Sequence, residues 1–189
     1  MRNAQKNKLL FITTLLLLLC LNLNAQKTKS QNAIKQKPYK YKQGFRVGFG
    51  LNVGPVFSKP YTLALGLDGR LQYDLSKRYS FTLTTGFTNL FATGNSKDLG
   101  FIPLKAGFKG FVWNDQFYVM GEIGPAFAVT NNYDKTAIII APSIGFATKY
   151  IDISLRFEQY SNFPTISNNT KGEGTGQLAL RLAYGFRLK

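Results

Sequence analysis

Residues 61–75 alternate between large apolar side chains and small or polar ones. Because successive side chains of a β-strand point to opposite faces, a period of two predicts a strand with one apolar and one polar face. The pattern recurs in eight segments, and the charged residues within them share the polar parity. The predicted strands are residues 44–57, 61–75, 79–91, 101–112, 117–129, 137–148, 151–160 and 176–188.

The strand lengths and the connections between the strands point to a barrel that crosses a membrane. Most segments reach the about 9–11 residues that a tilted strand needs to cross a bilayer. Short turns alternate with longer loops, as in outer-membrane barrels, and only the first outside connection, residues 58–60, is unexpectedly short. The turns are residues 76–78, 113–116 and 149–150, and the longer loops are residues 92–100, 130–136 and 161–175. Eight strands place both chain termini on the periplasmic side.

A soluble lipocalin-like barrel also alternates, with its apolar face inward. The polar parity here is rich in glycine, which suits a narrow interior where small residues must stand beside large ones. These glycines are Gly48, Gly50, Gly54, Gly66, Gly86, Gly107, Gly124, Gly145 and Gly185.

The apolar parity is too bulky for an eight-stranded interior, which is only just wide enough for its side chains. We therefore expect its aromatic residues to face lipid. They include Phe45, Phe49, Phe57, Phe81, Phe87, Phe91, Phe108, Phe117, Phe127, Phe146, Phe157 and Phe186.

Twelve charged residues are predicted to face inward, because a base at the lipid midplane costs about 2–4 kcal/mol. The acids and bases are nearly balanced, so we expect internal salt bridges that plug the barrel. The acids are Asp68, Asp74, Glu122, Asp152 and Glu158, and the bases are Arg46, Arg70, Lys105, Lys109, Arg156, Arg181 and Arg187. Four tyrosines near strand ends fit either an interface girdle or ordinary strand propensity: Tyr61, Tyr73, Tyr79 and Tyr184.

Residues 1–25 have the form of a secretory signal peptide, with a basic start, an apolar run over residues 9–23 and a cleavage-like site ending in Ala25. A membrane anchor is the alternative, but the core from Leu9 to Cys20 is too short to span easily. Leu19 is not the small residue that a lipoprotein site places before its cysteine. Cleavage after Ala25 would remove Cys20, the only cysteine, and with it any thiol chemistry.

Residues 26–43 form a separate basic segment that holds six lysines. The segment combines low hydrophobicity with high net charge, which predicts a flexible periplasmic leader. It could bind anionic lipid or an acidic protein, but an exported chain seldom meets nucleic acid, so we expect no nucleic-acid partner. Residues 44–189 carry 15 bases against 9 acids and form the predicted barrel domain.

Several segments resemble eight-stranded outer-membrane barrels of Bacteroidota, the PorT-like and OmpX/OmpA-like barrels. They are the signal ending Asn24-Ala25-Gln26, Phe101-Ile-Pro-Leu-Lys-Ala-Gly-Phe108, Ala141-Pro-Ser-Ile-Gly-Phe146 and Ile151-Asp-Ile-Ser-Leu-Arg-Phe-Glu-Gln-Tyr160. The resemblance covers residues 44–189 and implies fold and location more than activity. Many such proteins end in an aromatic residue read by the barrel-assembly machinery, whereas this chain ends in Leu188-Lys189.

The chain contains no histidine, which removes the usual general base and the commonest metal ligand. Asp68 and Asp74 share a face but lie six residues apart, about 20 Å along a strand, too far for a glycosidase-type pair. Asp152 and Glu158 have the same spacing and are also too far apart. A carboxylate pair between Glu122 and an acid on a neighbouring strand remains an alternative. Residues 171–176 are glycine-rich but lack a Walker pattern. We predict no enzyme activity, no catalytic or metal-ligating residues and no cofactor.

Four functions fit the sequence. The first is a non-enzymatic outer-membrane barrel with a side-chain-filled lumen, acting structurally or through its loops, with membrane lipid as its partner. The second is an accessory subunit of a larger envelope complex for secretion, assembly or uptake, with residues 26–43 as a docking arm. A narrow anion-preferring channel and a soluble lipocalin-like binder are the remaining alternatives.

Overall fold

The structure is a computed structural model that describes residues 43–112, 116–131, 136–161 and 174–188. The predicted signal peptide and most of the basic segment lie outside the described residues. The described chain forms eight strands: β1 (Gly44–Pro55), β2 (Tyr61–Asp74), β3 (Tyr79–Ala92), β4 (Leu99–Val112), β5 (Phe117–Ala128), β6 (Thr136–Ala147), β7 (Ile151–Ser161) and β8 (Thr175–Arg187).

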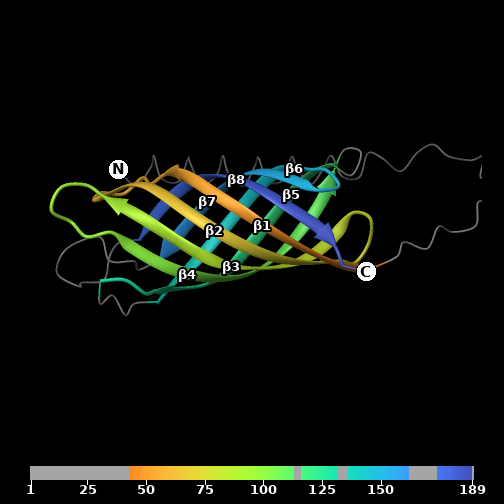
Figure 1. The fold of residues 1–189 in the computed structure, drawn as a ribbon, viewed down its shortest axis with the longest axis horizontal. Helices are drawn as coiled ribbons and strands as arrows, with labels where there is room; N and C mark the ends of the chain where they lie inside the picture. Colours follow the sequence, from red (N-terminus) through yellow and green to blue (C-terminus); the bar gives the residue numbers. More distant parts are fainter. Residues whose placement is uncertain (1–42, 113–115, 132–135, 162–173, 189) are drawn as a thin grey trace, which may run out of the picture. The chain divides into compact units, whose positions relative to one another are not determined.

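Each strand pairs antiparallel with its neighbours in the sequence, and β8 pairs with β1 to close a barrel (Figure 1). The closing register runs from Arg46 opposite Arg187 to Val53 opposite Leu180. Closure gives every strand two hydrogen-bonded neighbours and removes the exposed edges of an open sheet. The start of β1 and the end of β8 lie at the same end of the barrel, which we call the turn end; the opposite end is the loop end.

The predicted strand boundaries agree with the observed ones to within two residues. Each strand has 11 to 14 residues and therefore reaches the about 9–11 that a tilted membrane-crossing strand needs. No helix within the described ranges is long and apolar enough to cross a membrane.

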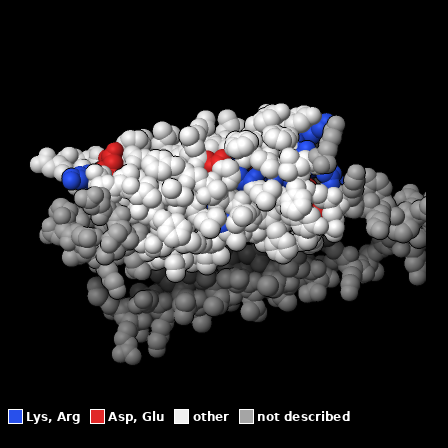
Figure 2. Space-filling model, turned by 60° about the horizontal axis from the view of Figure 1, so that its bottom comes forward, with Lys and Arg blue, Asp and Glu red and all other residues white. Residues whose placement is uncertain are grey.

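The exterior of the barrel is apolar, as the alternation predicts. Leu67 in β2 is 61% exposed and Phe49 in β1 is 62% exposed. Eleven of the twelve predicted outward phenylalanines are exposed, and only Phe146 is half-buried. Uncharged residues cover most of the face in Figure 2. A soluble lipocalin-like barrel has its apolar face inward, so this outward orientation is inconsistent with that alternative.

Inward glycines make room for large inward side chains. A Cβ at Gly50 would lie 2.9 Å from the Arg181 guanidinium, and one at Gly145 would lie 2.5 Å from the Tyr118 ring. At Gly54 the backbones approach so closely that a Cβ would meet the Leu178 carbonyl oxygen at 1.8 Å. The predicted pairing of small with large interior residues is therefore confirmed.

The predicted outward position of Tyr61 is wrong, because Tyr61 is only 3% exposed, and of its two interpretations only ordinary strand propensity remains. The pairing of β2 with β3 shifts register between Tyr61 and Leu63, so that Thr62 and Leu63 both face outward. Because of this irregularity, Tyr61 faces inward instead of outward. Tyr79 and Tyr184 are exposed and Tyr73 is half-buried, which fits either an interface girdle or ordinary strand propensity.

The interior at the loop end is apolar, an arrangement that the alternating pattern did not predict. Phe101 of β4 packs edge-on against Tyr160 of β7, with ring centroids 5.2 Å apart, and both side chains are fully buried. We call this group the apolar plug: Val56, Tyr61, Ala64, Leu90, Leu99, Phe101, Ala126, Ala137, Ile139, Ala141 and Tyr160. Extending the parity of Lys105 back along β4 would have placed Phe101 inside.

Candidate functional site: the charged interior and its vestibule

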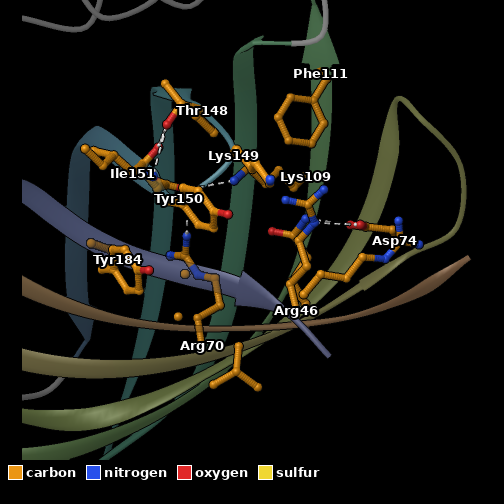
Figure 3. Close-up of a pocket in the computed structure, with 18 of the residues that line it drawn as sticks. Arg46, Arg70, Asp74, Lys109, Phe111, Thr148, Lys149, Tyr150, Ile151 and Tyr184 are labelled. Carbon is orange, nitrogen blue, oxygen red and sulfur yellow. Dashed lines mark hydrogen bonds and ion pairs between the residues drawn. The ribbon is translucent and has the colours of Figure 1, made fainter. Parts of the chain in front are cut away.

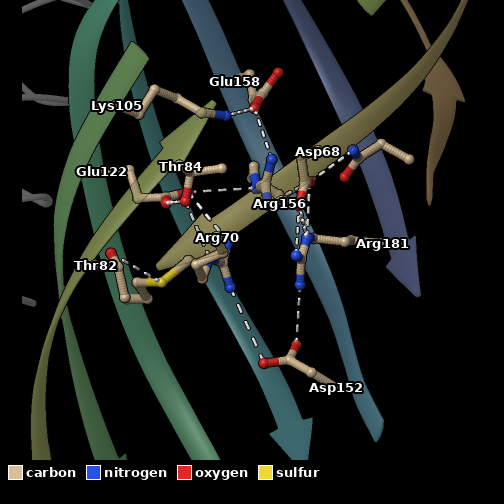
Figure 4. Close-up of polar contacts among 12 residues, drawn as sticks. Asp68, Arg70, Thr82, Thr84, Lys105, Glu122, Asp152, Arg156, Glu158 and Arg181 are labelled. Carbon is tan, nitrogen blue, oxygen red and sulfur yellow. Dashed lines mark hydrogen bonds and ion pairs between the residues drawn. The ribbon is translucent and has the colours of Figure 1, made fainter. Parts of the chain in front are cut away.

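Below the apolar plug, ion pairs fill the interior (Figure 4). Arg181 of β8 reaches across β1 to Asp68 of β2, with Nε donating to Oδ2 at 2.8 Å and Nη2 to Oδ1 at 2.5 Å. The path is open because Gly50, opposite Asp68 on β1, has no side chain. Asn52 donates a further hydrogen bond to Asp68 at 2.8 Å. This bidentate pair ties three adjacent strands together.

Glu158 of β7 gathers donors from both sides of the barrel. Lys105 of β4 donates to Glu158 Oε1 at 2.5 Å, and Arg156 Nη1 donates to the same atom at 3.1 Å. Gln177 of β8 and the Tyr160 hydroxyl donate to Oε2. Since β4 and β7 are not neighbours, the Lys105 contact crosses the lumen. Glu158 therefore stands where a pore would have to run.

A second carboxylate, Glu122 of β5, binds groups from β2 and β3. The Thr84 hydroxyl donates to Oε1 at 2.6 Å, and Arg70 Nη2 donates to Oε2 at 3.5 Å. Arg70 Nε also donates to the Thr84 hydroxyl at 3.1 Å. Arg156 lies between Glu122 and Asp68, at 3.7 and 3.8 Å from their oxygens. Glu122 therefore pairs with cations and a hydroxyl, and not with a second carboxylate, which fits a salt bridge that stabilises the barrel.

Asp152 of β7 lies nearest the turn end of this network. Lys109 of β4 donates to Oδ2 at 2.8 Å, and the Tyr118 hydroxyl donates to Oδ1 at 2.7 Å. The Lys109 ammonium also lies 3.7 Å from the Tyr118 ring centroid, a cation–π contact. Asp152 is the least buried acid of this group, with 18% of its side chain exposed.

The predicted salt-bridge network is thus confirmed, with one correction. Arg187 is exposed, because β8 ends there at the rim of the barrel, and it does not face a closed interior. Arg46 is half-buried and donates to Asp74 at 2.9 Å near the same rim. The uncharged members Thr84, Tyr118 and Gln177 were not predicted. Tyr118 and Gln177 share the parity of the charged residues in their strands, and Thr84 shares the parity of Gly86 in β3, which has no charged residue.

A cavity of about 420 Å³, which we call the vestibule, occupies the turn end (Figure 3). Its deep lining includes Arg70, Lys109 and Asp152, and its outer lining includes the exposed Lys149 and Tyr150. The vestibule therefore opens to the outside at the turn end. It leads to the ion-pair network and not through it, because the network and the apolar plug occupy the interior beyond.

The arrangement offers no evident chemistry for bond cleavage. The interior carboxylates each bind a cation, and the described ranges contain no cluster of three or more His, Cys, Asp or Glu side chains that could hold a metal ion. The absence of catalytic residues and cofactors stays a prediction.

A closed antiparallel barrel with an apolar exterior and a charged, filled interior defines the class: this is a small β-barrel of the outer-membrane type. Neither protein-family models nor curated proteins match the sequence.

Solved structures similar to this chain are eight-stranded or related membrane barrels. Ail, the attachment invasion locus protein of Yersinia pestis, is 14% identical over 76% of this chain and 97% of its own, with a TM-score of 0.49. The N-terminal barrel domain of Pseudomonas aeruginosa OprF is 12% identical over 77% of this chain and 100% of its own, with a TM-score of 0.49. Neisserial surface protein A is 13% identical over 76% and 98%, with a TM-score of 0.46. Similarities this low carry no information about function, and the strand pairing described above defines the fold.

Proposed function

We propose that the chain is a non-enzymatic outer-membrane barrel with a side-chain-filled lumen, which acts structurally or presents its outside loops for binding. The observation that supports this most is the filled interior: buried ion pairs such as Lys105–Glu158 cross the lumen, and the apolar plug lies above them. Membrane lipid is the partner that the exposed apolar exterior requires.

Export and orientation are part of the same proposal. Residues 1–25 would direct export and be removed, and the turn end would face the periplasm, as short turns do in such barrels. Membership of the PorT-like and OmpX/OmpA-like barrels of Bacteroidota is proposed from the sequence resemblance alone.

Cell fractionation tests the location. We expect the protein in the outer-membrane fraction, with an electrophoretic mobility that changes on heating because the closed barrel resists detergent until it unfolds. Recovery as a free periplasmic protein would contradict the proposal.

The filled lumen also bears on the channel alternative. We expect purified protein in a planar bilayer to show no conductance above that of the lipid alone, because Lys105 and Glu158 meet across the interior at 2.5 Å. Steady, anion-selective current steps would favour the channel instead.

A second candidate is an accessory subunit of a larger envelope complex. The supporting observation is the lysine-rich segment 26–43, which joins the barrel at the turn end because β1 begins there. Affinity purification with and without residues 26–43 tests it. Loss of specific envelope partners on deletion would favour a docking arm, and an unchanged set of partners would exclude that role for the segment.

A further inference from the structure

The connected network of interior ion pairs has one more cation than it has carboxylates. It holds five cations, Arg70, Lys105, Lys109, Arg156 and Arg181, and four carboxylates, Asp68, Glu122, Asp152 and Glu158. The separate pair of Asp74 with the half-buried Arg46 is balanced and leaves this excess unchanged. Buried charges are costly unless they are paired, so an unbalanced positive charge in such a site requires an explanation.

Two buried arginines have N–H groups without a hydrogen-bond partner among the described residues: Arg156 at Nε and Nη2, and Arg70 at Nη1. Of the two, only Arg70 lines the vestibule, and 4% of its side chain is exposed. The carboxylate oxygen nearest to Arg70 Nη1, Oδ2 of Asp152, is 4.0 Å away and already accepts a hydrogen bond from Lys109. A ligand that enters the vestibule from the turn end therefore contacts the Arg70 side chain.

The vestibule itself is strongly basic. Its lining holds seven basic side chains and two acidic ones, an excess of five positive charges. The bases are Arg46, Arg70, Lys77, Lys109, Lys149, Arg181 and Arg187, and the acids are Asp74 and Asp152. A concave site with low-dielectric walls and charge of one sign concentrates ions of the opposite sign.

We propose that the vestibule binds a small oxyanion of the phosphate class, which accepts a hydrogen bond from Arg70 Nη1 and balances the interior charge. The planar guanidinium suits phosphate oxygens, and the hydrogen bond gains strength from the charge on both partners. The volume of about 420 Å³ lies within the about 300–1,000 Å³ typical of small-molecule sites, so the phosphate can be free or part of a larger molecule such as a lipid headgroup. Water could occupy the same position, but it would leave the excess charge uncompensated.

Isothermal titration of the folded barrel in a neutral detergent tests the proposal. Inorganic pyrophosphate is the free-phosphate probe and glycerol 3-phosphate is the headgroup probe, each at an ionic strength held constant with sodium chloride. Saturable binding of either probe supports the site, and the tighter one indicates the source of the phosphate. Binding of neither probe would overturn the proposal.

Two variants locate the binding. Arg70→Gln removes the buried donor and Lys149→Gln removes an exposed cation of the outer lining, while Lys97→Gln removes a matched exposed charge from the loop between β3 and β4 at the loop end. We expect Arg70→Gln to weaken binding about tenfold or more, Lys149→Gln to weaken it severalfold and Lys97→Gln to leave it unchanged. If Arg70→Gln does not fold, the comparison of Lys149→Gln with Lys97→Gln tests the location of binding. Equal effects of these two would reduce the binding to general surface charge and contradict the site.

Discussion

At the scale of single residues, Arg181 shows how strongly the interior depends on complete pairing. It is 1% exposed and binds both oxygens of Asp68. Removing one member of a buried pair leaves the other charge without compensation, which costs more than the intact pair contributes.

Arg181→Met is therefore expected to lower the free energy of unfolding by about 3–5 kcal/mol, because Asp68 stays buried with only Asn52 and the more distant Arg156 near it. Urea unfolding of the barrel in lipid vesicles measures this. The double variant Asp68→Asn with Arg181→Met should lose less than the sum of its single variants, by about 0.5–3 kcal/mol. Strict additivity would show that the two side chains do not interact. Lys59→Met, at an exposed position, is the control, with a change within about 0.5 kcal/mol.

Two strand glycines differ in their surroundings, because Gly54 is buried and Gly121 is exposed. Gly54→Ala should destabilise the barrel by more than about 1 kcal/mol, because its Cβ would overlap the Leu178 backbone, which cannot rotate away. Gly121→Ala should be neutral or slightly stabilising, since nothing lies within 4 Å of a Cβ there and alanine restricts the unfolded chain. The same urea experiment compares them, and similar losses in both variants would indicate a general strand effect.

At the scale of the strand, the period of two predicted almost everything that depends on which face a residue occupies. It placed Leu67 outside and Asp68 inside, and both positions are confirmed. It failed at Tyr61, because a register shift adds a residue without leaving a mark in the sequence pattern.

Strand β2 also provides a test of what its outer face contacts. Leu67→Arg, near the middle of the strand, should cost about 2–4 kcal/mol in vesicles, whereas Thr62→Arg, exposed near the loop end of the same strand, should cost about 0–1 kcal/mol. Reversible unfolding from vesicles gives both values. Equal costs at the two depths would mean that the strand does not cross the hydrocarbon layer at this position.

At the scale of the whole molecule, the sequence predicted a closed barrel with a plugged interior but not the pairs that plug it. Which carboxylate meets which cation depends on the tilt and stagger of the strands, and a single-strand pattern carries no information on either. Lys105 and Glu158 lie 53 residues apart on strands that are not neighbours, and only closure of the barrel brings them together. The vestibule depends on the same stagger.

The central claim is that large apolar side chains face lipid while the charged parity faces the lumen. Nitroxide labels at Leu180, Leu182 and Ala183 of β8, each as a single cysteine in a Cys20→Ser background, test it in lipid vesicles. Leu180 and Leu182 point outward, whereas Ala183 is buried and lines the vestibule. Labels at 180 and 182 should collide mainly with oxygen dissolved in the lipid, and the label at 183 mainly with a water-soluble nickel complex. A reversed order, or no alternation between the three positions, would contradict the orientation of the barrel wall.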